Sequence, residues 1–139
     1  MAKAEIEINI RNGEEQFGAL RFQPDEAIEG TVTILPDSDV NCKHLYVRLE
    51  WHTEGRGSQF RQKVEELDLF QGDLQGLMPR TFDFSFRLPD EPWSYEGHYI
   101  SIVWAIAVQI DVPWGRDVKY EEPFLLSPQR EADSASSGW

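Results

Sequence analysis

Three histidines and one cysteine are the side chains of this 139-residue chain that could hold a transition metal. Cys42 and His44 are two residues apart, which would place both on one side of a strand. His52 lies further along the same segment, and His98 belongs to a different turn. Because zinc and copper sites need three or four convergent ligands, we expect no metal site, only surface histidines and a half-buried thiol.

Acid–base and nucleophilic chemistry finds little support in the residue spacing. Neighbours along a strand point to opposite faces, so adjacent carboxylates cannot act together. Such pairs are Glu14 and Glu15, Glu65 and Glu66, and Glu121 and Glu122. The chain lacks the G-x-S-x-G pattern of a nucleophile elbow, and "EGRGS" matches neither a dinucleotide-binding motif nor a P-loop. We therefore expect a protein without catalytic residues and without a cofactor.

Hydrophobic alternation along the chain predicts the secondary structure on which these residues lie. Apolar side chains recur at every second position, the period of a β-strand, in five segments: Ile6–Ile10, Ile28–Ile34, Leu45–Trp51, Phe82–Leu88 and Ile100–Ile110. No window of the sequence shows a comparable run at helical spacing. Clusters of Pro, Gly, Asn and Asp separate the strands, which predicts an all-β, antiparallel, immunoglobulin-like β-sandwich of seven or more strands.

The length and the 40% hydrophobic content suit a single domain with its own core. We expect the sandwich to occupy residues 1–126. The last segment, "SPQREADSASSGW", is small and polar and has no periodicity, so residues 127–139 are expected to form a flexible tail.

A hairpin is predicted over Leu45–Glu66, with its tip at Glu54–Gly57. The register that fits best sets Trp51 opposite Phe60 and Val47 opposite Val64 on one face, and Glu50 opposite Arg61 on the other. It also sets Arg48 opposite Lys63. The apolar parity changes after Cys42, so a bulge or a strand start is expected near Lys43 and His44.

Positive charge gathers on this hairpin, although the chain as a whole carries a net charge of -12. Arg48, Arg56, Arg61 and Lys63 form a candidate partner-binding face. One interpretation is an ordinary solvated sheet face relieved by nearby glutamates. The alternative is a docking face for an acidic or phosphorylated peptide, which clustered cations would suit.

Aromatic residues raise a second possibility, a sandwich that stacks sugar rings or binds peptides through exposed tryptophans. Trp51 and Trp104 belong to inward-facing series, whereas Trp93 and Trp114 lie beyond the two ends of the longest strand. Trp93 and Trp114 are therefore the candidate exposed aromatics. They could share a platform only if that strand bent sharply.

Composition excludes several classes of partner and location. A strongly acidic protein repels nucleic acids and anionic lipid surfaces. The apolar run Tyr99–Ile110 is too short to span a bilayer as a helix, so no integral membrane segment is expected. The single cysteine precludes an internal disulfide, and the N-terminus lacks the apolar core of a secretory signal, which favours the cytoplasm.

Four motifs occur in a recognisable order: "FQPDEAIEG", "FSFRLPDEPWSYEGHYISIVW", "DVPW" and "PFLL". Together they resemble the N-terminal domain of the arrestin family, including the alpha-arrestins and their bacterial relatives, over about residues 20–126. The residues that carry the resemblance are Pro24, Glu26, Gly30, Phe84, Phe86, Leu88, Pro89, Pro92, Ser94, Tyr95, Glu96 and Gly97. Asp25 stands where the family usually has glycine. Gly97 is expected to permit a tight reversal, and Tyr95 to bury its ring.

The resemblance implies a non-catalytic adaptor that binds other proteins through loops and sheet edges. No Pro-Pro-x-Tyr motif is present, and the charge fits poorly with a phosphate-sensing surface, so no phosphate-binding residues are carried over. The protein partner is unidentified. Since a lone half of a two-sandwich family exposes surface that the other half would cover, weak self-association through edge strands is also expected.

Overall fold

The computed structural model describes residues 4–57, 59–113 and 115–128, and every regular element within these ranges is a β-strand. The strands in chain order are β1 (Ala4–Ile10), β2 (Glu14–Gln16), β3 (Ala19–Phe22), β4 (Ala27–Pro36), β5 (Val40–Cys42), β6 (His44–Gly55), β7 (Arg61–Asp68), β8 (Gly72–Leu74), β9 (Arg80–Arg87), β10 (Tyr95–Glu96), β11 (Ile100–Asp111) and β12 (Val118–Leu126). The predicted all-β class is confirmed.

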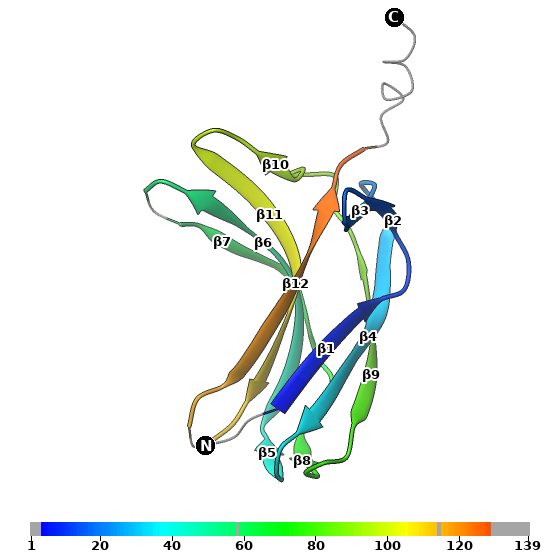
Figure 1. Cartoon of the computed structure of the whole chain (residues 1–139), viewed down its shortest axis with the longest axis vertical. Coiled ribbons are helices and arrows are strands. Elements are labelled where there is room, and N and C mark those ends of the chain that lie inside the picture. Colours follow the sequence, from blue (N-terminus) through cyan, green and yellow to red (C-terminus); the bar gives the residue numbers. More distant parts are fainter. Residues whose placement is uncertain (1–3, 58, 114, 129–139) are drawn as a thin grey trace, which may run out of the picture.

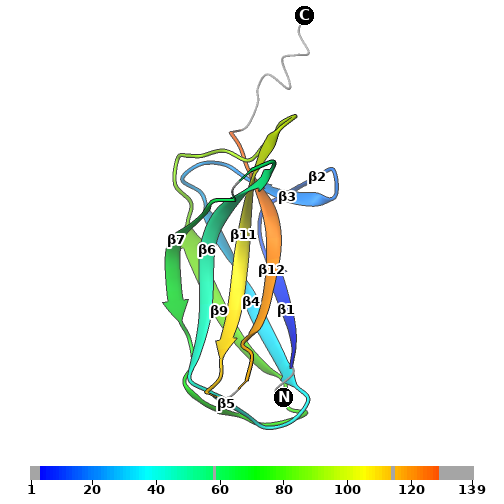
Figure 2. The same cartoon turned by 90° about the vertical axis from the view of Figure 1, so that its left-hand side faces the viewer.

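Two sheets pack face to face, as Figures 1 and 2 show. The small sheet has the order β1-β4-β9, and the large sheet has the order β2-β3-β12-β11-β6-β7, with β10 added to β11. A separate ladder joins β5 to β8. The pairs are antiparallel except β3 and β12, which run parallel where Arg21 and Phe22 meet Leu125 and Leu126.

The core lies between the sheets and is built by the predicted alternation. On β11 the side chains of Trp104, Ile106, Val108 and Ile110 are buried. The register with β6 places them opposite Trp51, Leu49, Val47 and Leu45 on the same face of the sheet. Ile28, Val32 and Ile34 of β4, with Phe84 and Phe86 of β9, supply the other layer. The central strand therefore buries this face from Trp104 to Ile110, whereas Ile100 at its start is exposed.

An aromatic cluster closes one end of this core. The indole of Trp104 packs on Phe124 with 6.0 Å between ring centroids, and Phe124 meets Phe22 edge-to-face at 5.6 Å. All three side chains are buried. The Trp104 Nε1–H donates to the carbonyl of Pro92 at 2.7 Å, which ties the loop before β10 to the core. The Trp104–Phe124 pair thus joins β11, β12, β3 and this loop.

The large sheet splits beyond this cluster. The ladder between β11 and β12 runs from Ile110–Val118 to Trp104–Phe124 and stops there. Beyond that pair, β11 takes β10 as its neighbour and β12 takes β3, so the two strands diverge towards one end of the sandwich (Figure 1).

The predicted register of the β6–β7 hairpin is wrong. Trp51 pairs with Gln62, and a bulge between Leu49 and Glu50 shifts the pairing again, which sets Arg48 opposite Glu66 instead of Lys63. Strand β6 continues into the expected tip, because Gly55 pairs with Ile100 of β11. Gly55 lies so close to the Tyr99 carbonyl that no side chain could be accommodated at this position. The strand start near Lys43 is confirmed, since β6 begins at His44.

The residues of the resemblance motifs occupy turns and close contacts. Asp25, which stands where the family has glycine, has a φ of 70°, and its carboxylate binds Arg87 Nε at 2.9 Å. Gly30 is buried against the Asn9 carbonyl and leaves no space for a Cβ. The expected reversal at Gly97 is present, because its N–H donates to the Ile100 carbonyl at 3.0 Å.

Tyr95 departs from expectation, because its side chain is 57% exposed. The core site at this end of the sandwich is filled by the Trp104–Phe124 pair, which leaves the tyrosine ring outside against Gly97. Pro24, Pro89 and Pro92 are partly buried, and Glu26 caps its turn by accepting the Gln23 N–H at 2.8 Å.

The predicted tail overlaps the described residues only at its start. Ser127 is anchored, since its N–H donates to the Phe22 carbonyl and its carbonyl accepts a hydrogen bond from Arg21. The rest of the predicted tail, residues 129–139, lies outside the described residues. No helix long and apolar enough to cross a membrane occurs in the described ranges.

Replacing Trp104 with phenylalanine tests the aromatic cluster. The substitution removes the hydrogen bond to Pro92 and leaves a cavity, so the free energy of unfolding should fall by about 2–3 kcal/mol in a urea titration. Trp93→Phe is the matched control: this half-exposed side chain also donates to a backbone carbonyl, and its loss should cost less than about 1 kcal/mol. Equal losses would contradict the assigned role of Trp104.

Phe17 provides a second test, because it sits at the tip of the β2–β3 hairpin with a φ of 53° and its side chain is 95% exposed. Asparagine tolerates this left-handed conformation better than phenylalanine, especially before Gly18. We expect Phe17→Asn to raise the free energy of unfolding by about 0.5–1 kcal/mol. Gly18→Ala should lower the free energy of unfolding. If both variants lowered it, the phenylalanine ring itself would have to stabilise the fold.

Candidate functional site

A polar hollow occupies the outer face of the large sheet, and we call it the sheet-face hollow. Its volume is about 380 Å³. Its lining residues come from four strands: Arg48, Glu50, Arg61, Ala107, Val108, Gln109, Lys119, Tyr120 and Glu121. The hollow forms because the outward positions of β11 carry small residues such as Ala105 and Ala107, while the neighbouring strands carry long polar side chains over them.

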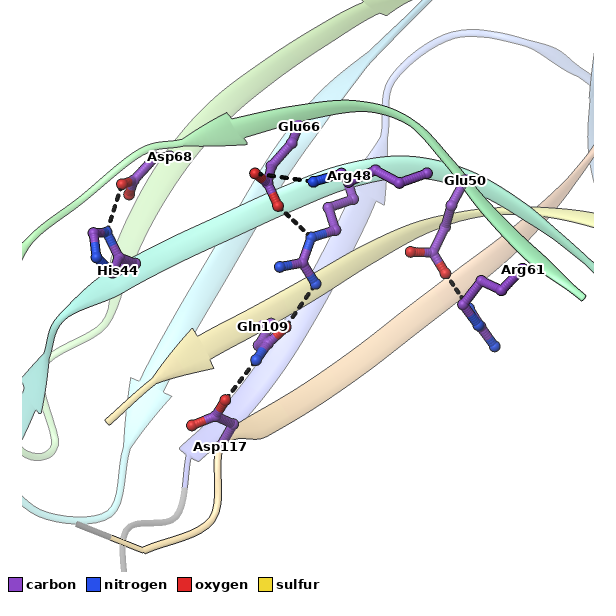
Figure 3. A network of polar contacts seen from close by, with 9 residues as sticks. His44, Arg48, Glu50, Arg61, Glu66, Asp68, Gln109 and Asp117 are labelled. Atoms are coloured by element: carbon purple, nitrogen blue, oxygen red, sulfur yellow. Dashed lines mark hydrogen bonds and ion pairs between the residues drawn. The ribbon is translucent and has the colours of Figure 1, made fainter. Parts of the chain in front are cut away.

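Ion pairs organise this face (Figure 3). Arg48 Nε lies 2.6 Å from Glu66 Oε2, and its guanidinium also donates to Gln109, which in turn donates to Asp117. Lys63 Nζ reaches the same Glu66 at 3.4 Å. The pKa of Glu66 lies below its ordinary value, chiefly because Arg48 donates to the carboxylate.

Glu50 is the most buried charge of the hollow, with its side chain 7% exposed. The guanidinium of Arg61 pairs with it and also lies 3.9 Å from Glu121 of β12, so Arg61 spans β11 from one side to the other. A buried carboxylate without a cation would be costly, and Arg61 is therefore fixed in place by Glu50.

The predicted basic face is only partly assembled. Arg48, Arg61 and Lys63 lie on one face of the sheet, and each is paired with a carboxylate. Arg56 is separate: it lies at the hairpin tip, with its guanidinium 5.4 Å from the centre of the Tyr99 ring. Lys119, which charge clustering in the sequence did not indicate, completes the hollow from β12.

A second concavity lies where the large sheet splits, and we call it the end cleft. Its volume is about 320 Å³. Its lining residues are Ala19, Glu54, Ser94, Tyr95, Glu96, Ser101, Ile102, Val103, Pro123, Phe124 and Leu125. Residues from both faces of β11 and β12 reach it because these strands have separated. Its walls are mostly apolar, and its two charged residues are both acidic.

The remaining candidates are dispersed. Trp93 is half-exposed and donates to the Asp90 carbonyl at 2.8 Å, and it lines neither concavity. Trp114 lies outside the described residues. Ser94 accepts the Leu126 N–H, which fixes the edge of the end cleft.

The groups considered for metal binding do not converge in the described ranges, where no cluster of three or more potential ligands occurs. His44 pairs with Asp68 at 2.7 Å, and His52 with Glu54 at 2.8 Å. Cys42 is fully buried rather than half-buried, and burial raises the pKa of its thiol to about 11.

Comparisons with known proteins support the fold. Neither models of protein families nor curated proteins give a match to this chain. Among solved structures, the crystal structure of Spo0M, a sporulation control protein from Bacillus subtilis, matches with a TM-score of 0.68 and 14% sequence identity. The match covers 91% of this chain and 50% of Spo0M, so the chain spans half the length of that protein. The fold of this chain is arrestin-like.

The Arg48–Glu66 contact predicts a pH dependence of stability. A carboxyl group whose pKa is lowered in the folded state stabilises the protein above its ordinary pKa of 4.5, and this contribution is lost as the pH falls through the folded value. Glu66→Gln should therefore cost about 1 kcal/mol at pH 7 and much less near pH 3. If the stability difference between the wild type and Glu66→Gln did not change with pH, an ionic contact with Arg48 would be contradicted. Glu7→Gln, at an exposed carboxylate on β1, is the control.

Proposed function

We propose that this domain is a non-catalytic protein-binding module, an adaptor that recognises an acidic or phosphorylated segment of its partner at the sheet-face hollow. The observation that carries the proposal is the presence of three cations around one hollow in a chain of net charge -12. Arg48 is paired with Glu66, and Arg61 with Glu50 and Glu121, whereas Lys119 has no ion pair in the described part of the chain.

The ion pairs of these cations determine which of them can bind a ligand. Arg61 is half-exposed and touches Glu121 only loosely, at 3.9 Å, so an incoming carboxylate or phosphate could replace Glu121 beside it. Lys119 is exposed and takes part in no ion pair found among the described residues. Small residues on β11 allow an extended segment to approach the sheet closely. The arrestin-like fold is consistent with this role, because it presents wide sheet faces and loops.

The alternative of a sugar-binding module has less support. That hypothesis depends on an exposed tryptophan beside a groove, and Trp93 borders neither concavity. The acidic-peptide role therefore remains the preferred proposal.

Lys119→Glu tests the proposal without disturbing the buried Glu50. Binding of a fluorescein-labelled phosphoserine peptide, followed by fluorescence anisotropy, should weaken roughly 5–10-fold, the effect of reversing one partly screened charge. Glu121→Gln should strengthen binding about 2-fold, because it removes the competing carboxylate.

Lys43→Glu, at an exposed lysine outside the hollow, is the matched control and should leave the affinity within about 2-fold. If the Lys43 and Lys119 reversals weaken binding equally, the attraction depends on net charge alone and the hollow is not the site.

A further inference from the structure

The end cleft has the opposite character from the sheet-face hollow, although both open on the large sheet. Its walls are apolar, formed by side chains such as Ile102, Val103 and Leu125. Its charged lining residues are Glu54 and Glu96, and no lysine or arginine lines it in the described part of the chain. An apolar site bordered by acids favours a ligand that is apolar and positively charged.

A second hollow extends this acidic border. It adjoins the end cleft through Ala19 and Pro123, which line both. It adds Glu15 and Glu122, again without a lysine or arginine in its lining. A chain leaving the end cleft in this direction would pass two further carboxylates.

The border of the end cleft is structurally fixed. Glu54 is held by His52, whose Nε2 lies 2.8 Å from the carboxylate, and the His52 ring is itself buried. Tyr95 stands half-exposed at one wall, on β10, which Ser94 joins to the end of β12. Preformed walls and an oriented carboxylate reduce the entropy that a ligand must lose on binding.

We propose that the end cleft binds an extended protein segment in which an apolar side chain is flanked by lysine or arginine. The apolar side chain enters between β11 and β12, where about 320 Å³ accommodates a leucine or phenylalanine. The flanking cations reach Glu54 and Glu96 on one side and Glu15 and Glu122 on the other. The inference rests on the proposed role as a protein-binding module, but not on the acidic ligand of the sheet-face hollow.

Charge complementarity distinguishes this occupant from two others. A second copy of the chain would bring net charge -12 against an acidic rim, and an anionic membrane would be repelled in the same way. The exposed side chain of Ile100, next in sequence to the lining residue Ser101, adds apolar surface beside the end cleft.

The probe for the test is a fluorescein-labelled peptide with one phenylalanine between two pairs of lysines. Glu54→Gln combined with Glu96→Gln should weaken its binding about 10-fold, the sum of two screened charge contacts. The control is Glu5→Gln combined with Glu7→Gln, two exposed carboxylates on β1 of the other sheet, which should change the affinity less than about 2-fold.

Ala19→Leu fills the end cleft without changing any charge, and it should also weaken binding about 10-fold while the unfolding midpoint stays near that of the wild type. Replacing the phenylalanine of the probe with serine should have a similar effect. The proposal would be overturned if the Glu54/Glu96 double variant and the Glu5/Glu7 double variant lost the same affinity. Unchanged affinity in Ala19→Leu would overturn it as well.

Two further measurements separate the alternatives. Light scattering that detects a dimer abolished by Ala19→Leu would assign the end cleft to a second copy and overturn the proposal. Lys119→Glu should not weaken binding of the lysine probe, even though it weakens binding of the phosphoserine peptide. If the wild-type protein bound the lysine probe but not the phosphoserine peptide, the sheet-face hollow would be refuted as a site and the end cleft would stand.

Discussion

The burial of Trp104 against Phe124 closes the core beneath β11, the strand that carries both the sheet-face hollow and the end cleft. Trp104 fills the end of the core, and its indole N–H holds the Pro92 carbonyl. Phe22 on β3 packs against the same Phe124 ring. Because this cluster takes up the space between the sheets, β11 and β12 can separate beyond it without opening the core to water. The end cleft is therefore a consequence of how the core is closed.

Strand β11 also determines the shape of the sheet-face hollow. One face of β11 is wholly apolar and large, whereas its other face carries residues as small as Ala105 and Ala107. Small residues leave space above the sheet, and the long side chains of β6, β7 and β12 surround it. Arg61 crosses this space between Glu50 and Glu121 and lies in the lining of the sheet-face hollow but not of the end cleft.

Charge is thus separated on one side of a strongly acidic protein. Cations and their paired carboxylates surround the small residues in the middle of β11, whereas the charged residues that line its diverging end are all acidic in the described part of the chain. Such an arrangement favours partners that carry both signs, or two different partners, because each surface repels the segment that the other attracts. The proposed adaptor role requires such a separation, because each surface must bind its own segment and not the other.

Much of the fold could be predicted from the sequence, because the alternation in β4, β6, β9 and β11 reports directly which side chains face the core. The register of the β6–β7 hairpin could not be predicted, because it depends on a bulge after Leu49 and on the pairing of Gly55 with β11. Both are features of the tertiary structure. Tyr95 was misplaced for a related reason: a tyrosine after a turn suits burial, but Trp104 and Phe124 already occupy the core position.

The candidate site was predictable only in part. Clustering of cations along one hairpin indicated Arg48, Arg61 and Lys63, which do lie on one face. Their carboxylate partners depend on the register, and Lys119 arrives from a strand distant in sequence. The end cleft has no signature in any single segment, because it arises where two strands that pair over most of their length move apart.

The most direct test of two oppositely charged binding surfaces is a pair of NMR titrations that map amide chemical shifts. We expect the lysine–phenylalanine peptide to shift the amide resonances of Ala19, Val103 and Leu125. We expect the phosphoserine peptide to shift those of Arg48, Gln109 and Glu121. Shifts on the same residues with both peptides, or shifts spread over β1 and β4, would contradict these expectations.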